Sequence, residues 1–179
     1  MTLLILIKRS CFFCFVFLLI LSYMKNYKSY TVEEASKALE NYCAYQERCH
    51  KEVEKKLHDL KMIPEARDKI ILHLLQNNYL NEERYAKSFA RGKFSIKKWG
   101  KRRIINELKF KGISTFNINA ALKEIDDKDY IKTLNKIAHK KGQLIKESNV
   151  FKKRNKLATF LISKGFESDL VYKVVKDII

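Results

Sequence analysis

Apolar residues recur three or four positions apart over most of this chain, which is the spacing of one face of an α-helix. The first clear pattern follows the segment Thr31-Val-Glu-Glu, where Thr31 can cap a helix and Glu34 can reach back to the Thr31 amide. We expect a helix here whose inward stripe comprises Val32, Ala35, Leu39, Tyr42 and Cys43.

Two more helices are predicted before residue 80. The first of them carries Val53, Leu57 and Leu60 on one face. Pro64 suits the first turn of the next helix, whose inward positions we predict to be Ala66, Ile70, Ile71, Leu74 and Leu75. These three helices form one three-helix unit.

The pattern of this unit recurs twice more. Superposing Leu57 on Leu108 and Leu161, at spacings of 51 and 53 residues, aligns further apolar positions. The aligned sets are Val53, Ile104 and Leu157; Met62, Ile113 and Phe166; Ile70, Ala121 and Val174; and Ile71, Leu122 and Val175. A period of about 50 residues predicts an array of repeats.

Glycine marks the same helix end in two of the copies. Gly112 and Gly165 stand where a helix would end in a left-handed residue, and the apolar residue after each would close a Schellman motif. The first copy has Lys61 at this position, so we expect its cap to be strained or differently built.

One further helix precedes each of the later pairs. We expect Asn81 to open a helix with Tyr85 and Phe89 inward, and Asp129 to open a helix with Tyr130, Leu134, Ile137 and Ala138 inward. The predicted fold is therefore all-α, with three tandem three-helix repeat units in an elongated, curved array. The units span residues 24–80 (helical from about residue 32), 81–127 and 128–179.

Residues 1–23 differ from the rest. The run from Cys11 to Leu21 is almost entirely apolar and follows Lys8 and Arg9. It is short for a membrane span, and although it resembles a signal peptide, no typical cleavage site follows Ser22. A third interpretation, which we favour, is that the native protein starts at Met24 and that the preceding residues come from a misassigned start.

Charge narrows the choice of partner. The formal net charge of +17 points to a polyanion, an acidic protein surface or an anionic membrane. Nine lysines and arginines lie between Arg91 and Lys111 against one acid, Glu107, and the same stretch holds the only tryptophan, Trp99. Unpaired cations are costly to bury, so this basic stretch is expected to face solvent or a partner.

No motif for a reaction is present. The sequence lacks a phosphate-binding glycine loop, an HExxH motif and a nucleophile elbow, and its histidines are scattered at positions 50, 58, 73 and 139. Cys11 and Cys14 have CxxC spacing without a second pair, and Cys43, Cys49 and His50 do not have zinc-site spacing. We therefore predict a non-enzymatic protein with no cofactor, no metal and no disulfide.

Helical geometry refines the candidate binding surface. After Gly100, Ile104, Ile105 and Leu108 point inward, so that Arg102, Arg103, Asn106 and Lys109 should point outward. Phe110 also falls on the outward side, either packing against an adjoining unit or anchoring a partner. Trp99 and Phe94 suit the core better than a stacking platform, and Arg84 and Arg91 could pair with Glu82 or Glu83 instead of binding.

Two groups of residues are the candidates for partner binding. The central group comprises Arg84, Arg91, Lys93, Lys97, Lys98, Lys101, Arg102, Arg103, Lys109, Phe110 and Lys111. A second basic face, which could equally serve only solubility, comprises Lys140, Lys141, Lys146, Lys152, Lys153, Arg154 and Lys156.

The segment NEERYAKSFARGKFSIKKWGKRRIINELKFKGI, residues 81–113, resembles the central signature of the RecX family, bacterial regulators of the RecA recombinase. The resemblance extends over residues 32–179 and includes the three-unit layout. It implies a non-enzymatic protein that lies along the groove of the RecA filament on single-stranded DNA, and we expect the protein to be monomeric and cytoplasmic. On the filament it would restrain the ATPase, strand-exchange and coprotease activities of RecA.

Two other functional classes stay open from the sequence. A nucleic-acid-binding helical protein acting independently of RecA would explain the charge equally well. A membrane-tethered basic protein would depend wholly on the run from Cys11 to Leu21.

Overall fold

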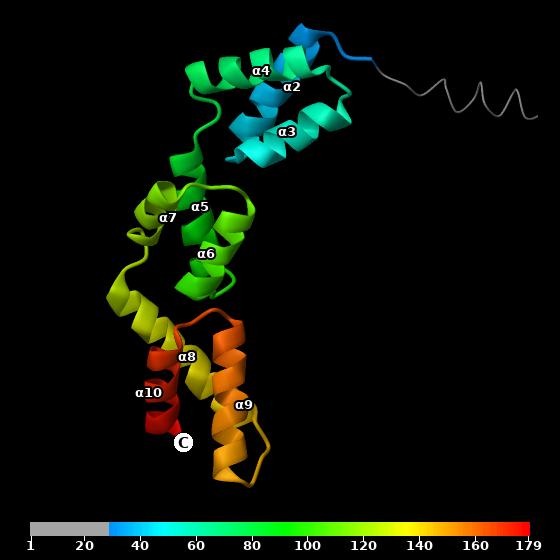
Figure 1. Ribbon diagram of the computed structural model, residues 1–179. Coiled ribbons are helices and arrows are strands. Elements are labelled where there is room, and N and C mark those ends of the chain that lie inside the picture. The colour runs from blue at the N-terminus through cyan, green and yellow to red at the C-terminus, as the bar shows by residue number, and fades with distance from the viewer. Residues whose placement is uncertain (1–28) are drawn as a thin grey trace, which may run out of the picture.

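The computed structural model describes residues 29–179, and their regular secondary structure consists of nine α-helices (Figure 1). In chain order these are α2 (Val32–Tyr45), α3 (His50–Asp59), α4 (Pro64–Gln76), α5 (Glu82–Ser95), α6 (Lys101–Phe110), α7 (Thr115–Leu122), α8 (Asp127–Leu144), α9 (Val150–Ser163) and α10 (Ser168–Ile178). The predictions for residues 1–23, for a start at Met24 and for Cys11 and Cys14 lie outside the described residues.

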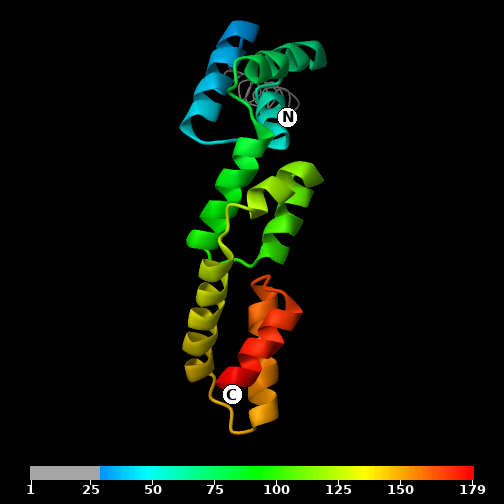
Figure 2. The same cartoon turned by 90° about the vertical axis from the view of Figure 1, so that its left-hand side faces the viewer.

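The helices pack in consecutive groups of three. Helices α2–α4 contact one another, as do α5–α7 and α8–α10, and we call these groups the first, second and third units. The units follow one another end to end, which gives a long and curved molecule (Figures 1 and 2). The prediction of an all-α array of three-helix units is confirmed. No helix within residues 29–179 is long and apolar enough to cross a bilayer.

The apolar interior is divided into two cores. One core belongs to the first unit and contains Leu39, Val53, Leu57 and Leu74 among its buried residues. The other runs without a break through the second and third units, from Tyr85 to Val175, and from the first unit it takes only Cys49. The second and third units are therefore joined by shared packing, whereas the first unit has a core of its own.

The helix starts follow side-chain capping. Thr31 and Glu34 form the predicted capping box at α2, and the Asn81 side chain accepts a hydrogen bond from the Arg84 amide at the start of α5. The predicted start of the next helix at Asp129 is wrong. Helix α8 begins at Asp127, and Asp126 is its cap, accepting a hydrogen bond from the Asp129 amide at 3.0 Å.

Two residues predicted to point inward are exposed. Leu75 is 45% exposed because it lies beyond the buried arc of α4, about 40° further round the helix than Ile71, which is already at the edge of that arc. Val32 is 47% exposed in the first turn of α2. The remaining predicted inward positions of α2 and α4 are buried or packed against the core.

All three units end their second helix in the same left-handed turn. Gly112 and Gly165 have φ of 81° and 92°, and Lys61 has φ of 57°. In each case the next residue donates its amide to a carbonyl five positions back, as Met62 does to Leu57 at 3.1 Å, which is the Schellman pattern. The strained cap predicted at Lys61 is confirmed, since a left-handed residue other than glycine is unfavourable.

The second and third units meet through their backbones. The Gly100 amide donates to the Lys164 carbonyl at 2.9 Å, and the Arg102 amide donates to the Gly165 carbonyl at 3.0 Å. The approach is so close that a Cβ on Gly100 would lie 2.2 Å from the carbonyl carbon of Gly165. The unpaired amides at the start of α6 thus bind the carbonyls at the end of α9.

The first and second units meet differently. Cys49, the cap position of α3, stands where the second unit has Gly100, and the junction is bridged by a side chain. The Lys51 ammonium donates to the Phe110 carbonyl at 2.8 Å. This junction also holds the pocket described next.

Candidate partner-binding surface

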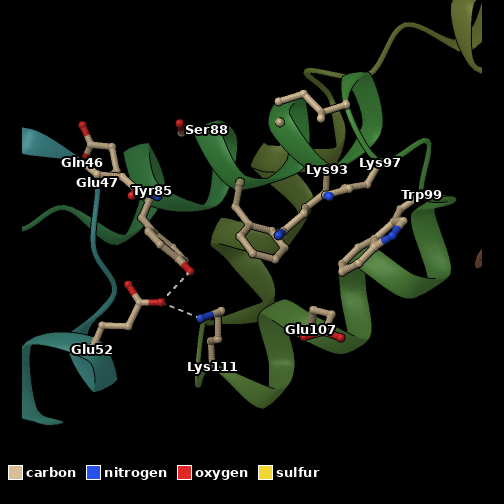
Figure 3. A pocket seen from close by; sticks show the side chains of 13 residues that line it. Gln46, Glu47, Glu52, Tyr85, Ser88, Lys93, Lys97, Trp99, Glu107 and Lys111 are labelled. Atoms are coloured by element: carbon tan, nitrogen blue, oxygen red, sulfur yellow. Dashed lines mark hydrogen bonds and ion pairs between the residues drawn. The ribbon is translucent and has the colours of Figure 1, made fainter.

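A pocket of about 460 Å³ opens where the first unit meets the second (Figure 3). Its walls carry both charges and aromatic rings. The residues that matter below are Glu52, Tyr85, Phe89, Lys93, Lys97, Trp99, Glu107 and Lys111. Three of them, Lys93, Lys97 and Lys111, belong to the central group predicted from the sequence.

Glu52 of α3 fixes one end of the pocket. Its Oε1 accepts a hydrogen bond from the Lys111 ammonium at 2.6 Å and another from the Tyr85 hydroxyl at 3.4 Å, as the dashed lines in Figure 3 show. Burial, and then the negative charge of Glu52, raise the pKa of Tyr85 well above its usual value. The phenol therefore stays protonated and acts as a donor across the junction.

Cations and aromatic rings alternate along the other wall. The Lys93 ammonium lies 5.0 Å from the ring centre of Phe89 and 5.1 Å from that of Trp99. The Arg103 guanidinium lies 4.1 Å from the Trp99 ring centre. These are cation–π distances, so Trp99 holds two cations in place while packing against the core.

The arginines at the start of α6 face the third unit. The Arg103 guanidinium donates to the Ser163 carbonyl at 3.3 Å, and that of Arg102 donates to the Ser168 hydroxyl at 3.3 Å. Both had been predicted to point outward toward a partner. Arg102 is exposed as expected, but each arginine reaches the third unit, because the interlocked backbones bring α9 and α10 beside α6.

At the other end of α6, Lys109 and Phe110 do point outward. Phe110 is 80% exposed, and the Lys51 ammonium lies 5.7 Å from its ring centre. Lys109 forms no ion pair with any residue of the described chain. Because the Phe110 ring is so exposed, it does not pack closely against an adjoining unit, which was one of the two predicted roles.

Arg84 and Arg91 are paired, but with partners other than Glu82 and Glu83. The Arg84 guanidinium donates to Glu47 Oε1 at 2.6 Å and so ties α5 to the loop between α2 and α3 in the first unit. Arg91 lies 3.3 Å from the Glu124 carboxylate in the second unit. The predicted partners are wrong because each arginine meets an acid that is distant in sequence.

Lys101 also has an internal role. Its ammonium lies 2.6 Å from the Asp127 carboxylate, lowering the pKa of that group, and 4.9 Å from the ring centre of Tyr130. The Tyr130 hydroxyl accepts from the Lys101 amide at 3.0 Å and donates to Glu167 Oε2 at 2.6 Å. Phe94 packs on the same ring, 5.8 Å away, so it belongs to the core as expected.

The second basic face is only partly free. Lys156 pairs with Glu147 at 2.6 Å and lowers the pKa of that carboxyl, and the Lys141 ammonium lies 5.1 Å from the Phe160 ring centre. The Nε of Arg154 is buried with no hydrogen-bond partner among the described residues. Lys140, Lys146 and Lys152 are exposed, whereas Lys153 is half-buried.

Sequence reasoning missed the acids that organise this surface. Glu47 and Glu52 hold Arg84, Lys111 and Tyr85, yet nothing in the local pattern distinguished them from surface glutamates. The repeat did offer one signal. Tyr85 and Tyr130 both stand four residues after a helix cap, and each hydroxyl forms a hydrogen bond with the preceding unit, Tyr85 with Glu52 and Tyr130 with the Lys101 amide.

Known proteins match this chain in two ways. The family profiles described as "RecX, second three-helix domain" and "RecX, third three-helix domain" match residues 81–122 and 127–175. The crystal structure of RecX from Lactobacillus salivarius superposes with a TM-score of 0.73 at 28% identity, covering 82% of this chain and 96% of that one. The chain belongs to the RecX family.

Curated RecX proteins show the same relationship. The regulatory protein RecX of Finegoldia magna is 33% identical over 138 residues, which is 75% of this chain and 66% of that protein. That of Lactobacillus johnsonii is 30% identical over 135 residues, again 75% of this chain but 50% of its own length. This chain thus spans between half and two thirds of these relatives. They are named regulatory proteins, which agrees with the prediction of a non-enzymatic function.

Proposed function

We propose that this RecX chain regulates the RecA recombinase by lying along the RecA filament on single-stranded DNA and restraining its ATPase, strand-exchange and coprotease activities. Family membership supports a regulatory role, and the RecX resemblance supplies RecA as the partner. The elongated array suits a filament, because each unit can contact a successive part of a repeating surface. A protein that acts on RecA would be located in the cytoplasm, where RecA and its DNA are found.

The observation that carries this proposal is a pair of exposed phenylalanines, Phe110 at the end of α6 and Phe116 at the start of α7, which we call the Phe110 surface. Phe110 is 80% exposed, and Phe116 is 77% exposed. At the matching positions the first unit has Asp59 and Glu65, and the third unit has Ser163 and Asp169. Only the second unit of the three therefore presents two phenylalanines here, which is typical of a protein interface rather than of a solvated turn.

Charge supports an acidic partner at the same place. Lys109 lies beside Phe110 and has no ion-pair partner in the described chain, and the Lys51 ammonium lies near the Phe110 ring. An exposed aromatic side chain with lysines nearby fits an apolar pocket with an acidic rim. We therefore expect RecA to offer this combination to the second unit.

The test measures RecA ATPase on single-stranded DNA against increasing amounts of this protein. Substituting Phe110→Ala and Phe116→Ala should raise the concentration needed for half inhibition about tenfold or more, since one aromatic anchor can contribute about 2 kcal/mol. Phe151→Ala is the matched control, because Phe151 is 71% exposed in the third unit. Inhibition that is equally strong in all variants would remove this surface from the proposal, and nucleotide hydrolysis by the protein alone would contradict the function.

A further inference from the structure

A groove along α8 is lined by four lysines. From the sequence, two of them were assigned to different surfaces and the other two to neither surface. The groove has a volume of about 440 Å³ and is lined by Lys98, Asp129, Lys132, Thr133, Lys136, Ile137 and Lys140. Lys98 had been assigned to the central group and Lys140 to the second basic face. All four lysines are exposed, and none forms an ion pair with another described residue.

The lysines of α8 are regularly spaced. Lys128, Lys132, Lys136 and Lys140 follow one another every four residues, so each is about 6 Å further along the helix axis than the last. Like charges at this spacing destabilise a helix. A bound polyanion would remove that repulsion along the whole row.

The second unit shows that this charge is not a property of the repeat. Counted from their helix caps, Lys87 and Arg91 of α5 correspond to Lys132 and Lys136 of α8. Lys87 pairs with Glu83 at 2.7 Å, and Arg91 pairs with Glu124 at 3.3 Å. In α8 the residue that corresponds to Glu83 is Lys128. The same positions are thus neutralised in the second unit and left charged in the third.

Lys98 joins this row from a different element. It has φ of 54°, a left-handed conformation that favours glycine, in the turn that follows α5. Its amide donates to the Phe94 carbonyl at 3.1 Å, which helps hold the turn. A strained lysine at this point places one more cation on the groove, whose lining contains a single acid, Asp129.

We propose that this groove binds the phosphodiester backbone of a nucleic-acid strand. Charges repeat at a constant interval along such a strand, as the lysines do along α8, whereas the acids of a protein surface have no such period. Lysine binds phosphate as a point charge, and the lining has no aromatic ring on which a base could stack. Binding is therefore independent of base sequence. The groove is separate from the Phe110 surface, and its function does not require RecA.

The test uses the full chain and a labelled oligonucleotide, with fluorescence anisotropy at several salt concentrations. The variant carries Lys132→Gln, Lys136→Gln and Lys140→Gln, because glutamine keeps helix propensity while removing charge. The matched control carries Lys37→Gln, Lys55→Gln and Lys69→Gln, three exposed lysines of the first unit without ion pairs, so both proteins lose three charges. Circular dichroism confirms that both remain folded.

We expect the α8 variant to bind single-stranded DNA about tenfold or more weakly at low salt, with a salt slope shallower by about two, and the control to bind like the parent. Binding to a duplex of the same length is measured with the same proteins. If the α8 substitutions weaken duplex binding more than single-strand binding, duplex is the preferred ligand. Equal weakening of both variants would reduce the effect to net charge and overturn the proposal, as would unchanged binding by the α8 variant. Inhibition of RecA is measured separately with the Phe110→Ala and Phe116→Ala variants, so a failure of the groove proposal is distinguished from a failure of the proposed function.

Discussion

At the scale of single residues, glycine has opposite roles at two positions with ordinary backbone conformations. Gly92 lies inside α5, where an added Cβ would meet nothing within 4 Å. Gly100 lies at the junction of the second and third units, where a Cβ would meet the backbone of Gly165 at 2.2 Å. One glycine is therefore an avoidable entropic cost, and the other is required by close approach.

Alanine at these two positions should change stability in opposite directions. Gly92→Ala should raise the free energy of unfolding by about 0.5–1 kcal/mol, because the folded helix accepts the methyl group and the unfolded chain loses freedom. Gly100→Ala should lower it by about 1–3 kcal/mol through overpacking. Urea unfolding followed by circular dichroism measures both, and equal effects would show that the backbones do not interlock.

A third substitution concerns the left-handed turn of the first unit. Lys61→Gly should stabilise the protein by about 0.5–1 kcal/mol, because glycine adopts φ of 57° without steric cost, although the unfolded chain gains freedom. The same urea titration measures the change. Leu60→Gly, one position earlier where φ is −77°, is the control and should destabilise the protein.

Local sequence sufficed for these turns but not for the charged surface. Gly112 and Gly165 were predictable because the residue type, the helix end and the following apolar residue all agreed. Asp126 and Asp129 could both cap a helix, so the start of α8 was misplaced. The partner of Arg91 is Glu124, 33 residues away, and no local pattern encodes that contact.

At the scale of the element, α8 carries a row of unneutralised charge that should limit its stability. Lys136→Glu would convert two repulsive i, i+4 contacts, with Lys132 and Lys140, into attractive ones. We expect the free energy of unfolding to rise by about 0.5–1 kcal/mol at low salt and oligonucleotide binding to weaken. Thermal melts at low and high salt check the first effect, and a rise that persists at high salt would contradict the electrostatic cause.

Tyr130 links α8 to the starts of α6 and α10. The pH dependence of its contribution to stability follows from its burial. Burial, and then the hydrogen bond to Glu167, raise the pKa of Tyr130 well above its usual value. In the unfolded chain the phenol ionises near pH 10, so its contribution is complete below that pH and is lost as pH rises beyond it.

The free energy of unfolding should therefore decrease above about pH 10. In the Tyr130→Phe variant this decrease should be smaller, by about 1 kcal/mol near pH 11. Near neutral pH the same variant should be less stable by about 1–2 kcal/mol, because Glu167 and the Lys101 amide lose a partner. Urea midpoints at pH 8 and pH 11 measure both differences. Parallel curves for the two proteins would show that the phenol ionises equally in both states.

At the scale of the whole molecule, the two cores divide the array unequally. The larger core contains only Cys49 from the first unit, and burial raises the pKa of that thiol. The first unit keeps a small core of its own around Leu39 and Leu57. The second and third units should therefore behave as one folding body, to which the first is attached.

Cutting the chain between the first and second units tests this division. We expect residues 78–179 to form a folded, cooperatively unfolding protein, because almost all of the larger core lies within them. Residues 29–80 alone, which keep Leu80 in their core, should be only marginally stable, as expected for about 50 residues with a small core. Thermal melts and amide hydrogen exchange measure both fragments. Loss of cooperative unfolding in residues 78–179 would show that the first unit completes the fold.

The interlocked backbones also give the array a direction, and they determine which unit could be repeated to lengthen it. The second unit offers the donating glycine, Gly100, at one end and a left-handed glycine, Gly112, in the turn that would accept the next donor. The first unit has Cys49 and Lys61 at these places, and the third has Lys153 and Gly165. Among the three, only the second unit can therefore be copied in tandem with glycine at every new joint, so a lengthened protein should be built by duplicating it.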